Sequence, residues 1–306
     1  MPASTTLFEG LDLLDLWHVY GSISIVSTLR NTTPSKISRQ TSSFLNELGL
    51  DKYGRGAPDL SRLQDSAVLQ LLRLAYQEWR LQHLRLKIFP TFAASSAFSN
   101  ADSLMNLDVL YDMHLSADAL ALHLNDRRID IVVSSCLDLA GECIQEAQNN
   151  PNSPYVVIAL FQEPLLLSLN PAHPLAGMKY VTADDCRDFP SAGYPEGIAS
   201  LGAQALQDRG LWKFPCKKPR FALSEWQIGM TVPVGLCYKT SHMMTLAPEC
   251  KDLIEVSLDK PLSQTVCILA LKDLLNSPAF DVTVATIRRL MLDASRTNNH
   301  PVEWLT

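Results

Sequence analysis

The chain has 306 residues, 47% of them apolar and 19% charged, which excludes a disordered chain and suits two folded domains of unequal size. Its formal net charge of −6 excludes a generally basic nucleic-acid binder, so any DNA-binding surface must be local. It has no basic signal-peptide start and no apolar run near the roughly 18 residues that span a membrane, so we expect a cytoplasmic protein.

The first 63 residues are polar and rich in hydroxyl groups, and they predict a winged helix-turn-helix domain. Ser22 is suited to cap a helix over Ile23–Leu29, and a short polar turn follows over 31–33. Proline favours the first turn of a helix, so a second helix is expected over Pro34–Leu48. Gly49 then ends this helix, as glycine commonly does.

The second helix carries the expected DNA-binding surface. Between Gly21 and Asn46 there are three basic residues and no acidic one. Hydroxyl and amide groups beside them can bind phosphates and base edges, and residues 51–56 are expected to form the wing. The residues expected to contact DNA are Arg30, Thr33, Ser35, Lys36, Ser38, Arg39, Gln40 and, on the wing, Arg55. The pattern leaves open a solvated helical hairpin with no special role.

Residues 64–85 predict one long helix, since no glycine or proline occurs from Ser61 to Phe89. Two neighbouring apolar stripes at helical spacing make its apolar face too broad for a lone surface helix. They are Val68, Leu72, Ala75 and Trp79, and Leu71, Leu74, Leu81 and Leu84. We interpret it as a dimerisation helix that pairs with its copy in a second subunit. The alternative is a core helix of a larger domain.

From Leu86 onward, apolar strand-like runs alternate with amphipathic helices, which is typical of an α/β domain. Strands are expected over 86–89, 107–111, 129–133, 155–160, 164–169, 221–223, 253–257 and 265–271. Helices are expected over 117–124, 198–211, 227–238 and 278–295. Several of the strand runs do not alternate in polarity, which favours strands buried on both faces of a mixed or parallel sheet.

The segment from Ser22 to Leu50 resembles the signature of LysR-type transcriptional regulators. It contains Ser22-Ile23-Ser24, the hydroxyl-rich turn Thr32-Thr33, Ile37-Ser38-Arg39-Gln40 and Leu48-Gly49, in the family's order and without gaps. It departs from the family at the small pair, here Val26-Ser27, and at Arg30, Pro34 and Leu45. Later segments also resemble the family, in the right order and spacing: Arg85–Ile88, Leu124–Val132, Glu163–Leu167, His173–Ala176 and Met230–Leu236.

The resemblance implies a fold of mixed class: a winged helix-turn-helix over 1–63, a linker helix over 64–85, and a two-lobed α/β effector domain, like a periplasmic binding protein, over 86–306. Lobe I is expected over about 86–162 and 266–306, and lobe II over about 163–265. It also implies an effector cleft between the lobes. The residues expected to line the cleft are Thr91, Ser95, Ser96, Ser134, Ser135, Tyr194, Ser224 and Glu225.

The partners implied are promoter DNA with a partly palindromic site, a small polar or anionic metabolite, a second copy of the chain in a dimer or tetramer, and RNA polymerase. Hydroxyls and backbone amides in the cleft favour an anionic or polar ligand, whereas Glu225 would favour an amine. One alternative is a regulator-like sensor that has lost DNA recognition. Another is a solute-binding protein of a transporter, which the first 85 residues argue against.

Neither catalysis nor a cofactor is expected. The serine-nucleophile, zinc-protease, phosphate-loop and dinucleotide-binding motifs are all absent from the sequence. The seven histidines show no metal-ligand spacing, and the seven cysteines include no C-x-x-C pair. We therefore expect no enzyme activity, no metal site and no disulfide framework, with most cysteines acting as small buried apolar residues.

Overall fold

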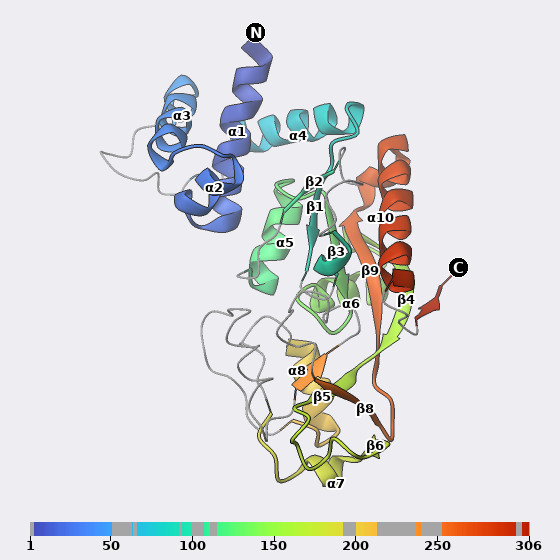
Figure 1. Cartoon of the computed structure of the whole chain (residues 1–306). Helices are drawn as coiled ribbons and strands as arrows, with labels where there is room; N and C mark the ends of the chain where they lie inside the picture. The colour runs from blue at the N-terminus through green and yellow to red at the C-terminus, as the bar shows by residue number, and fades with distance from the viewer. Residues whose placement is uncertain are drawn as a thin grey trace.

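The computed structural model describes residues 3–50, 63, 66–91, 94–98, 107–110, 115–191, 200–212, 237–239, 253–297 and 302–305. Figure 1 shows a helical amino-terminal unit, a helix α4 that lies beside α1, and two β-sheets that follow one another away from them. The helical unit, helices α1 to α3, is called the head below. The described elements confirm the expected mixture of a helical amino terminus and an α/β remainder.

The head contains α1 (Ala3–Tyr20), α2 (Ile23–Leu29) and α3 (Pro34–Glu47). The Ser22 hydroxyl accepts the Ile25 N–H at 3.4 Å, and the Thr33 hydroxyl accepts the Lys36 N–H at 3.3 Å, so both N-caps satisfy otherwise free donors. Gly49, just after the end of α3, has a φ of +69°, a conformation that glycine adopts easily. Helices α2 and α3 thus begin and end as expected.

Helix α1 was not anticipated from the sequence. It packs across α3, where Gly10 lies directly against Phe44: a Cβ at position 10 would come within 2.8 Å of the Phe44 side chain. Leu11 and Leu14 join Phe44 in one buried cluster. The other side of α1 contributes Trp17 to a different core, which it shares with the α/β domain. Helix α1 therefore holds the head to the rest of the chain.

Helix α4 (Ala67–Gln82) occupies most of the long helix expected over 64–85. Its Ser66 N-cap accepts the Leu69 N–H at 3.4 Å. The distribution of its side chains is unusual, because the buried face includes Arg73 and Arg80 while Leu71 is 67% exposed. Val68 and Leu74 are exposed beside Leu71. No described helix is long and apolar enough to cross a membrane.

The larger sheet has six strands in the order β10-β4-β9-β3-β1-β2. Strand β1 runs parallel to β2 and β3, whereas β9 runs antiparallel to β3 and β4. Short β10 pairs antiparallel with β4 at the edge. The bounds are β1 Lys87–Pro90, β2 Asp108–Val109, β3 Ile131–Ser135, β4 Tyr155–Pro164, β9 Ser263–Leu271 and β10 Glu303–Trp304.

Helices cover both faces of this sheet (Figure 1). Helices α5 (Ala117–Asn125) and α6 (Gly141–Asn149) share one core with Trp17 and Tyr20 of the head. Helix α10 (Pro278–Thr297) shares the other core with the short helices η1 (Ser95–Phe98) and η5 (Lys272–Asn276). Burial on both faces explains why strands such as β3, whose residues are all buried, show no polar alternation.

The smaller sheet has four strands in the order β6-β8-β5-β7. The chain passes between the sheets twice, from β4 into β5 and from β8 into β9. The bounds are β5 Leu166–Leu169, β6 Tyr180–Val181, β7 Cys237–Lys239, β8 Ile254–Leu258, α7 Ala183–Cys186 and α8 Ser200–Asp208. The helix expected over 227–238 is wrong at its end, because Cys237 and Tyr238 pair with β5 in β7. The rest of that helix and the strand expected over 221–223 lie outside the described residues.

Candidate functional site

The outer face of α3 is exposed and carries cationic and hydroxyl side chains. Ile37, Thr41 and Phe44 point inward and are buried, so Ser35 and Arg39 are left exposed on the opposite side of the helix. Lys36 is exposed beside them. Because this face combines two cations with a hydroxyl, it can hydrogen-bond phosphates and base edges.

The other expected contact residues of α3 flank this face. Thr33 is exposed, and its hydroxyl caps the helix and lies 3.2 Å from the Ser35 hydroxyl. Ser38 and Gln40 are half-buried at the two sides of the helix. Gln40 and Lys36 also line a cavity between α3, α1 and α4. Arg55 and the expected wing lie outside the described residues.

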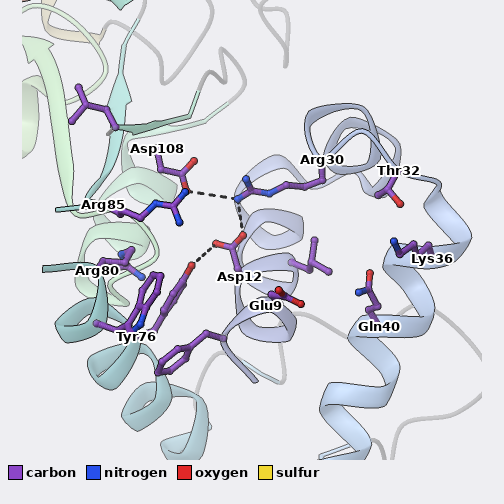
Figure 2. Close-up of a pocket in the computed structure, with 14 residues that line it drawn as sticks. Glu9, Asp12, Arg30, Thr32, Lys36, Gln40, Tyr76, Arg80, Arg85 and Asp108 are labelled. Carbon is purple, nitrogen blue, oxygen red and sulfur yellow. Dashed lines mark hydrogen bonds and ion pairs between the residues drawn. The ribbon is translucent and has the colours of Figure 1, made fainter. Parts of the chain in front are cut away.

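Arg30, expected to contact DNA, is held by carboxylates within the chain. Its guanidinium lies 2.6 Å from an Asp12 oxygen on α1 and 3.7 Å from an Asp108 oxygen on β2 (Figure 2). Burial opposes the charge on Arg30, but Asp12 and Asp108 outweigh it and raise its pKa. Arg30 therefore joins the head to the larger sheet.

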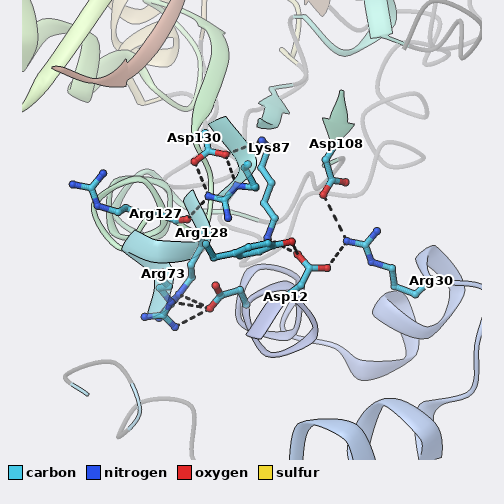
Figure 3. A network of polar contacts seen from close by, with 11 residues as sticks. Asp12, Arg30, Arg73, Lys87, Asp108, Arg127, Arg128 and Asp130 are labelled. Atoms are coloured by element: carbon cyan, nitrogen blue, oxygen red, sulfur yellow. Dashed lines mark hydrogen bonds and ion pairs between the residues drawn. The ribbon is translucent and has the colours of Figure 1, made fainter. Parts of the chain in front are cut away.

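A buried ion-pair junction connects the head, α4 and the larger sheet (Figure 3). Asp15 lies 2.8 Å from Arg73, Asp12 lies 2.6 Å from the Lys87 ammonium, and Asp130 lies 2.7 Å from Arg80. The junction has four acidic and four basic members, so its charges balance: Asp12, Asp15, Asp126 and Asp130, with Arg73, Arg80, Lys87 and Arg128. Such pairing offsets the cost of removing charges from water.

The pKa values of the junction carboxylates follow from this pairing. Burial raises the pKa of Asp130, but Arg80 and hydrogen bonds from Lys87 N–H and Gln77 bring it below its ordinary value. Burial likewise raises the pKa of Asp12, and Lys87 and Arg30 reverse the shift. Sequence reasoning missed these residues, although two aspartates within the apolar run 11–17 were a usable signal.

Expected effector residues gather where β1 and β3 end side by side. The Thr91 hydroxyl lies 3.1 Å from the Ser134 hydroxyl and donates to the Asp138 carboxylate. Ser135 instead donates to Gln264 Oε1 at 2.6 Å, and Gln264 donates to Glu163 at 2.8 Å, where the chain passes between the sheets. Thr91, Ser134 and Ser135 are buried, so their hydroxyls serve contacts within the chain.

The remaining cleft residues are placed only in part. Ser95 and Ser96 lie in η1, shortly after Thr91. Tyr194, Ser224 and Glu225 lie outside the described residues, so the far wall of the expected cleft is not described. Asp138 was missed by the sequence reasoning, although it follows the same strand as Ser134 and Ser135 and is half-buried there.

No protein-family model and no curated protein sequence matches the chain. Solved structures do match it. Full-length OxyR from Pseudomonas aeruginosa aligns with a TM-score of 0.56 at 14% identity, covering 92% of this chain and 97% of OxyR. CbnR, in a complex with its target DNA, aligns with a TM-score of 0.53 at 14% identity, covering 92% of this chain and 99% of CbnR.

OxyR from Corynebacterium glutamicum aligns with a TM-score of 0.54 at 14% identity, covering 96% of this chain and 94% of that protein. The chain has the LysR-type fold. In this fold, α1 to α3 form the helical head, α4 follows it, and the two sheets form two lobes. Thr91, Ser134 and Asp138 lie in the lobe built on the larger sheet.

Two cysteines of the described lobes, Cys143 and Cys267, are poorly placed for thiolate chemistry. Burial raises the pKa of Cys143 to about 11 and that of Cys267 to about 12. Both thiols therefore stay protonated at neutral pH, as expected for small apolar core residues. Among the described residues, no group of histidine, cysteine or acidic side chains is arranged to hold a metal ion.

Proposed function

We propose that this protein is a DNA-binding transcriptional regulator whose promoter binding is modulated by a small-molecule effector held between the two lobes. The observation that carries the proposal is the outer face of α3, where Ser35, Lys36 and Arg39 are exposed on a capped helix. CbnR, which has the same fold, is known in a complex with its target DNA. The role is regulatory rather than catalytic, and its place is the cytoplasm.

The local charge of the head supports DNA contact despite the net charge of −6. Residues 21–46 contain no acidic side chain, and one of their three cations, Arg30, is held within the chain. Lys36 and Arg39 remain available for phosphates, which dominate protein–DNA affinity. The proposed DNA contacts on α3 and its cap are Thr33, Ser35, Lys36, Ser38, Arg39 and Gln40.

The protein is proposed to act as a homodimer or a dimer of dimers through α4. Val68, Leu71 and Leu74 are 44%, 67% and 45% exposed, so an apolar stripe on this helix faces solvent in the single chain. On the opposite face, Arg73 pairs with the head and Arg80 pairs with Asp130 beside β3. A second copy of the same helix would cover the stripe and place two recognition helices for a partly palindromic site.

The effector is proposed to be a small polar metabolite bound beside Thr91, Ser95, Ser96 and Ser134. Its binding would shift the angle between the lobes, and α4 would transmit this to the head and to contacts with RNA polymerase. Asp138 favours an effector that presents a hydrogen-bond donor to the first lobe. Ser135 donates to Gln264, near the point where the chain passes between the two sheets, so it can respond to movement between the lobes.

The test is fluorescence anisotropy with DNA fragments from upstream of the protein's own and neighbouring genes, across a salt series. We expect log affinity to fall linearly with log salt. Arg39→Ala and Lys36→Ala should weaken binding and reduce the salt slope by about 0.9 for each phosphate that the variant no longer neutralises. Arg289→Ala, at an exposed position on α10, is the matched control and should bind as the wild type does.

One alternative has support in the head itself, where Arg30 is held by Asp12 and Pro34 replaces the family's glutamine. A sensor that has lost DNA recognition would show no binding at any salt concentration while remaining folded and dimeric. That result would overturn the DNA-binding proposal.

A further inference from the structure

Four alternating charges join the head to the larger sheet (Figure 3). On the head, an Asp12 oxygen lies 2.6 Å from the guanidinium of Arg30, the residue that ends α2. On the sheet, Lys87 and Asp108 are register partners in the parallel strands β1 and β2. The Lys87 ammonium lies 2.6 Å from Asp12, and an Asp108 oxygen lies 3.7 Å from Arg30. An acid–base pair of the head therefore lies against an acid–base pair of the sheet with the charges reversed.

The two contacts across this boundary differ in strength. The side chains of Lys87 and Asp12 are 1% and 12% exposed, and Asp12 also accepts the Tyr76 hydroxyl at 3.3 Å. The side chains of Arg30 and Asp108 are 36% and 31% exposed and lie further apart. Exposed ion pairs contribute little to stability. The contact between Arg30 and Asp108 can therefore open while the buried part of the junction stays closed.

This weaker contact is the one that reaches the recognition helix. The Arg30 N–H closes α2 on the Val26 carbonyl, and Thr33, three positions further on, caps α3. Among the described residues, the Arg30–Asp108 contact is the only ion pair or hydrogen bond between residues 21–50 and the larger sheet. Figure 2 shows the Arg30 side chain extending from the end of α2 toward Asp108. Asp108 thus attracts the α2–α3 turn toward the sheet, away from the exposed outer face of α3.

Strands β1 and β2 connect this contact to the expected effector cleft. The Asp108 N–H donates to the Leu86 carbonyl at 3.3 Å, so β2 is fixed to the start of β1. Thr91, expected to contact the effector, follows the other end of β1. A shift of β1 that accompanies effector binding would therefore change the distance between Asp108 and Arg30.

We propose that Asp108 is an autoinhibitory latch: its carboxylate holds Arg30 and keeps the helix-turn-helix drawn against the larger sheet, which lowers the affinity for DNA. An effector that moves β1 away from the head opens the latch and strengthens DNA binding. The effect on DNA affinity rests on the proposed function, whereas the restraint of the head by Asp108 is a property of the protein without DNA.

The first test is hydrogen–deuterium exchange of the full-length protein without DNA, measured by mass spectrometry. Asp108→Asn removes the charge that holds Arg30 and should raise the exchange rate of amides in residues 21–36 about 2- to 5-fold, the range that an exposed ion pair gives. Asp108→Glu has a side chain one methylene longer, which closes the gap to Arg30, so exchange should become slower. In an Arg30→Gln background, Asp108→Asn should have no further effect. Asp259→Asn, at an exposed position after β8, is the matched control and should exchange as the wild type does.

The second test measures the DNA affinity of the same variants by fluorescence anisotropy. Asp108→Asn should tighten binding about 2- to 5-fold and Asp108→Glu should weaken it, and neither change should occur in the Arg30→Gln background. A general effect of lost negative charge would instead tighten binding in Asp259→Asn and in the Arg30→Gln background as well, and would overturn the latch.

The proposal is also overturned if Asp108→Asn leaves exchange over residues 21–36 unchanged, or if Asp108→Asn and Asp108→Glu act in the same direction. Altered exchange with unaltered DNA affinity would overturn the autoinhibitory role. A wild-type protein that binds no DNA at any salt concentration would overturn the DNA-binding proposal by itself, and exchange alone would then decide whether Asp108 restrains the head.

Discussion

The Arg80–Asp130 pair connects α4 to the larger sheet, and replacing Arg80 by methionine should destabilise the fold strongly. The Asp130 side chain is fully buried and accepts four hydrogen bonds: Arg80 Nε at 2.8 Å, Arg80 Nη2 at 2.7 Å, Gln77 Nε2 at 2.8 Å and Lys87 N at 2.8 Å. Methionine fills similar space but removes two of the four donors and the balancing charge. A buried charge left without its partner costs about 3–5 kcal/mol.

Urea unfolding at pH 7, followed by circular dichroism, measures this change in the free energy of unfolding. Asp130→Asn and the double variant complete a cycle, and the double variant should lose less than the sum of the single losses because charge is then absent from both positions. We expect a coupling energy of at least about 2 kcal/mol, within the range found for contacting pairs.

The pH dependence gives a second, independent signature. In the wild type the pKa of Asp130 lies below its ordinary value, so its contribution to stability is present above the unfolded pKa and is lost as pH falls through the folded pKa. In Arg80→Met, burial prevails and raises this pKa, so the variant loses stability as pH rises instead. The difference between the two proteins should therefore shrink from pH 7 to about pH 4, near the ordinary pKa of aspartate. A loss below about 1 kcal/mol at pH 7, or a difference that does not change with pH, would refute the reasoning, since exposed pairs give such values.

Three further predictions follow from other contacts. Burial, reinforced by Arg128 and Arg73, lowers the pKa of His18 to about 2 and that of His123 to about 3. Only the unfolded chain then gains these protons below about pH 6.5, so stability should fall by about 1.4 kcal/mol per pH unit for each histidine; His18→Asn should roughly halve this slope in urea titrations, and an unchanged slope would count against the assignment. Gly10→Ala places a Cβ within 2.8 Å of Phe44 and should lower the melting temperature of the protein through overpacking, at a cost of about 1–3 kcal/mol. Gly177→Ala, which meets open space, is its control, and equal melting temperatures for the two variants would contradict the packing. Leu71→Glu should shift the protein from dimer to monomer in analytical ultracentrifugation while leaving the circular dichroism spectrum intact, because Leu71 is 67% exposed in the single chain; a variant that remains dimeric would place the interface elsewhere.

Local chemistry in the sequence determined the helices of the head that carry recognition. Ser22, Thr33, Pro34 and Gly49 act on neighbouring backbone groups, so the ends of α2 and α3 could be predicted without knowing what packs around them. The buried strands β1, β3, β4 and β9 were predictable for a similar reason, because a run of apolar residues bounded by turn residues needs no partner to be recognised.

Tertiary structure alone decided which charges are buried. Sequence periodicity identified the apolar side of α4 but not the side that packs within the chain. Arg73 and Arg80, each paired with an aspartate, are buried, whereas Leu71 is exposed. The assignment of Arg30 to DNA contact likewise could not take account of Asp12 and Asp108, which lie 18 and 78 positions away in the chain. Helix α1 was missed because Gly10 and two aspartates interrupt its apolar pattern. The groups that explain these three residues lie in distant segments of the chain: the Phe44 ring packs against Gly10, and buried cations pair with the aspartates. Burying a charge is costly unless an opposite charge lies beside it, and the fold decides which charges lie side by side.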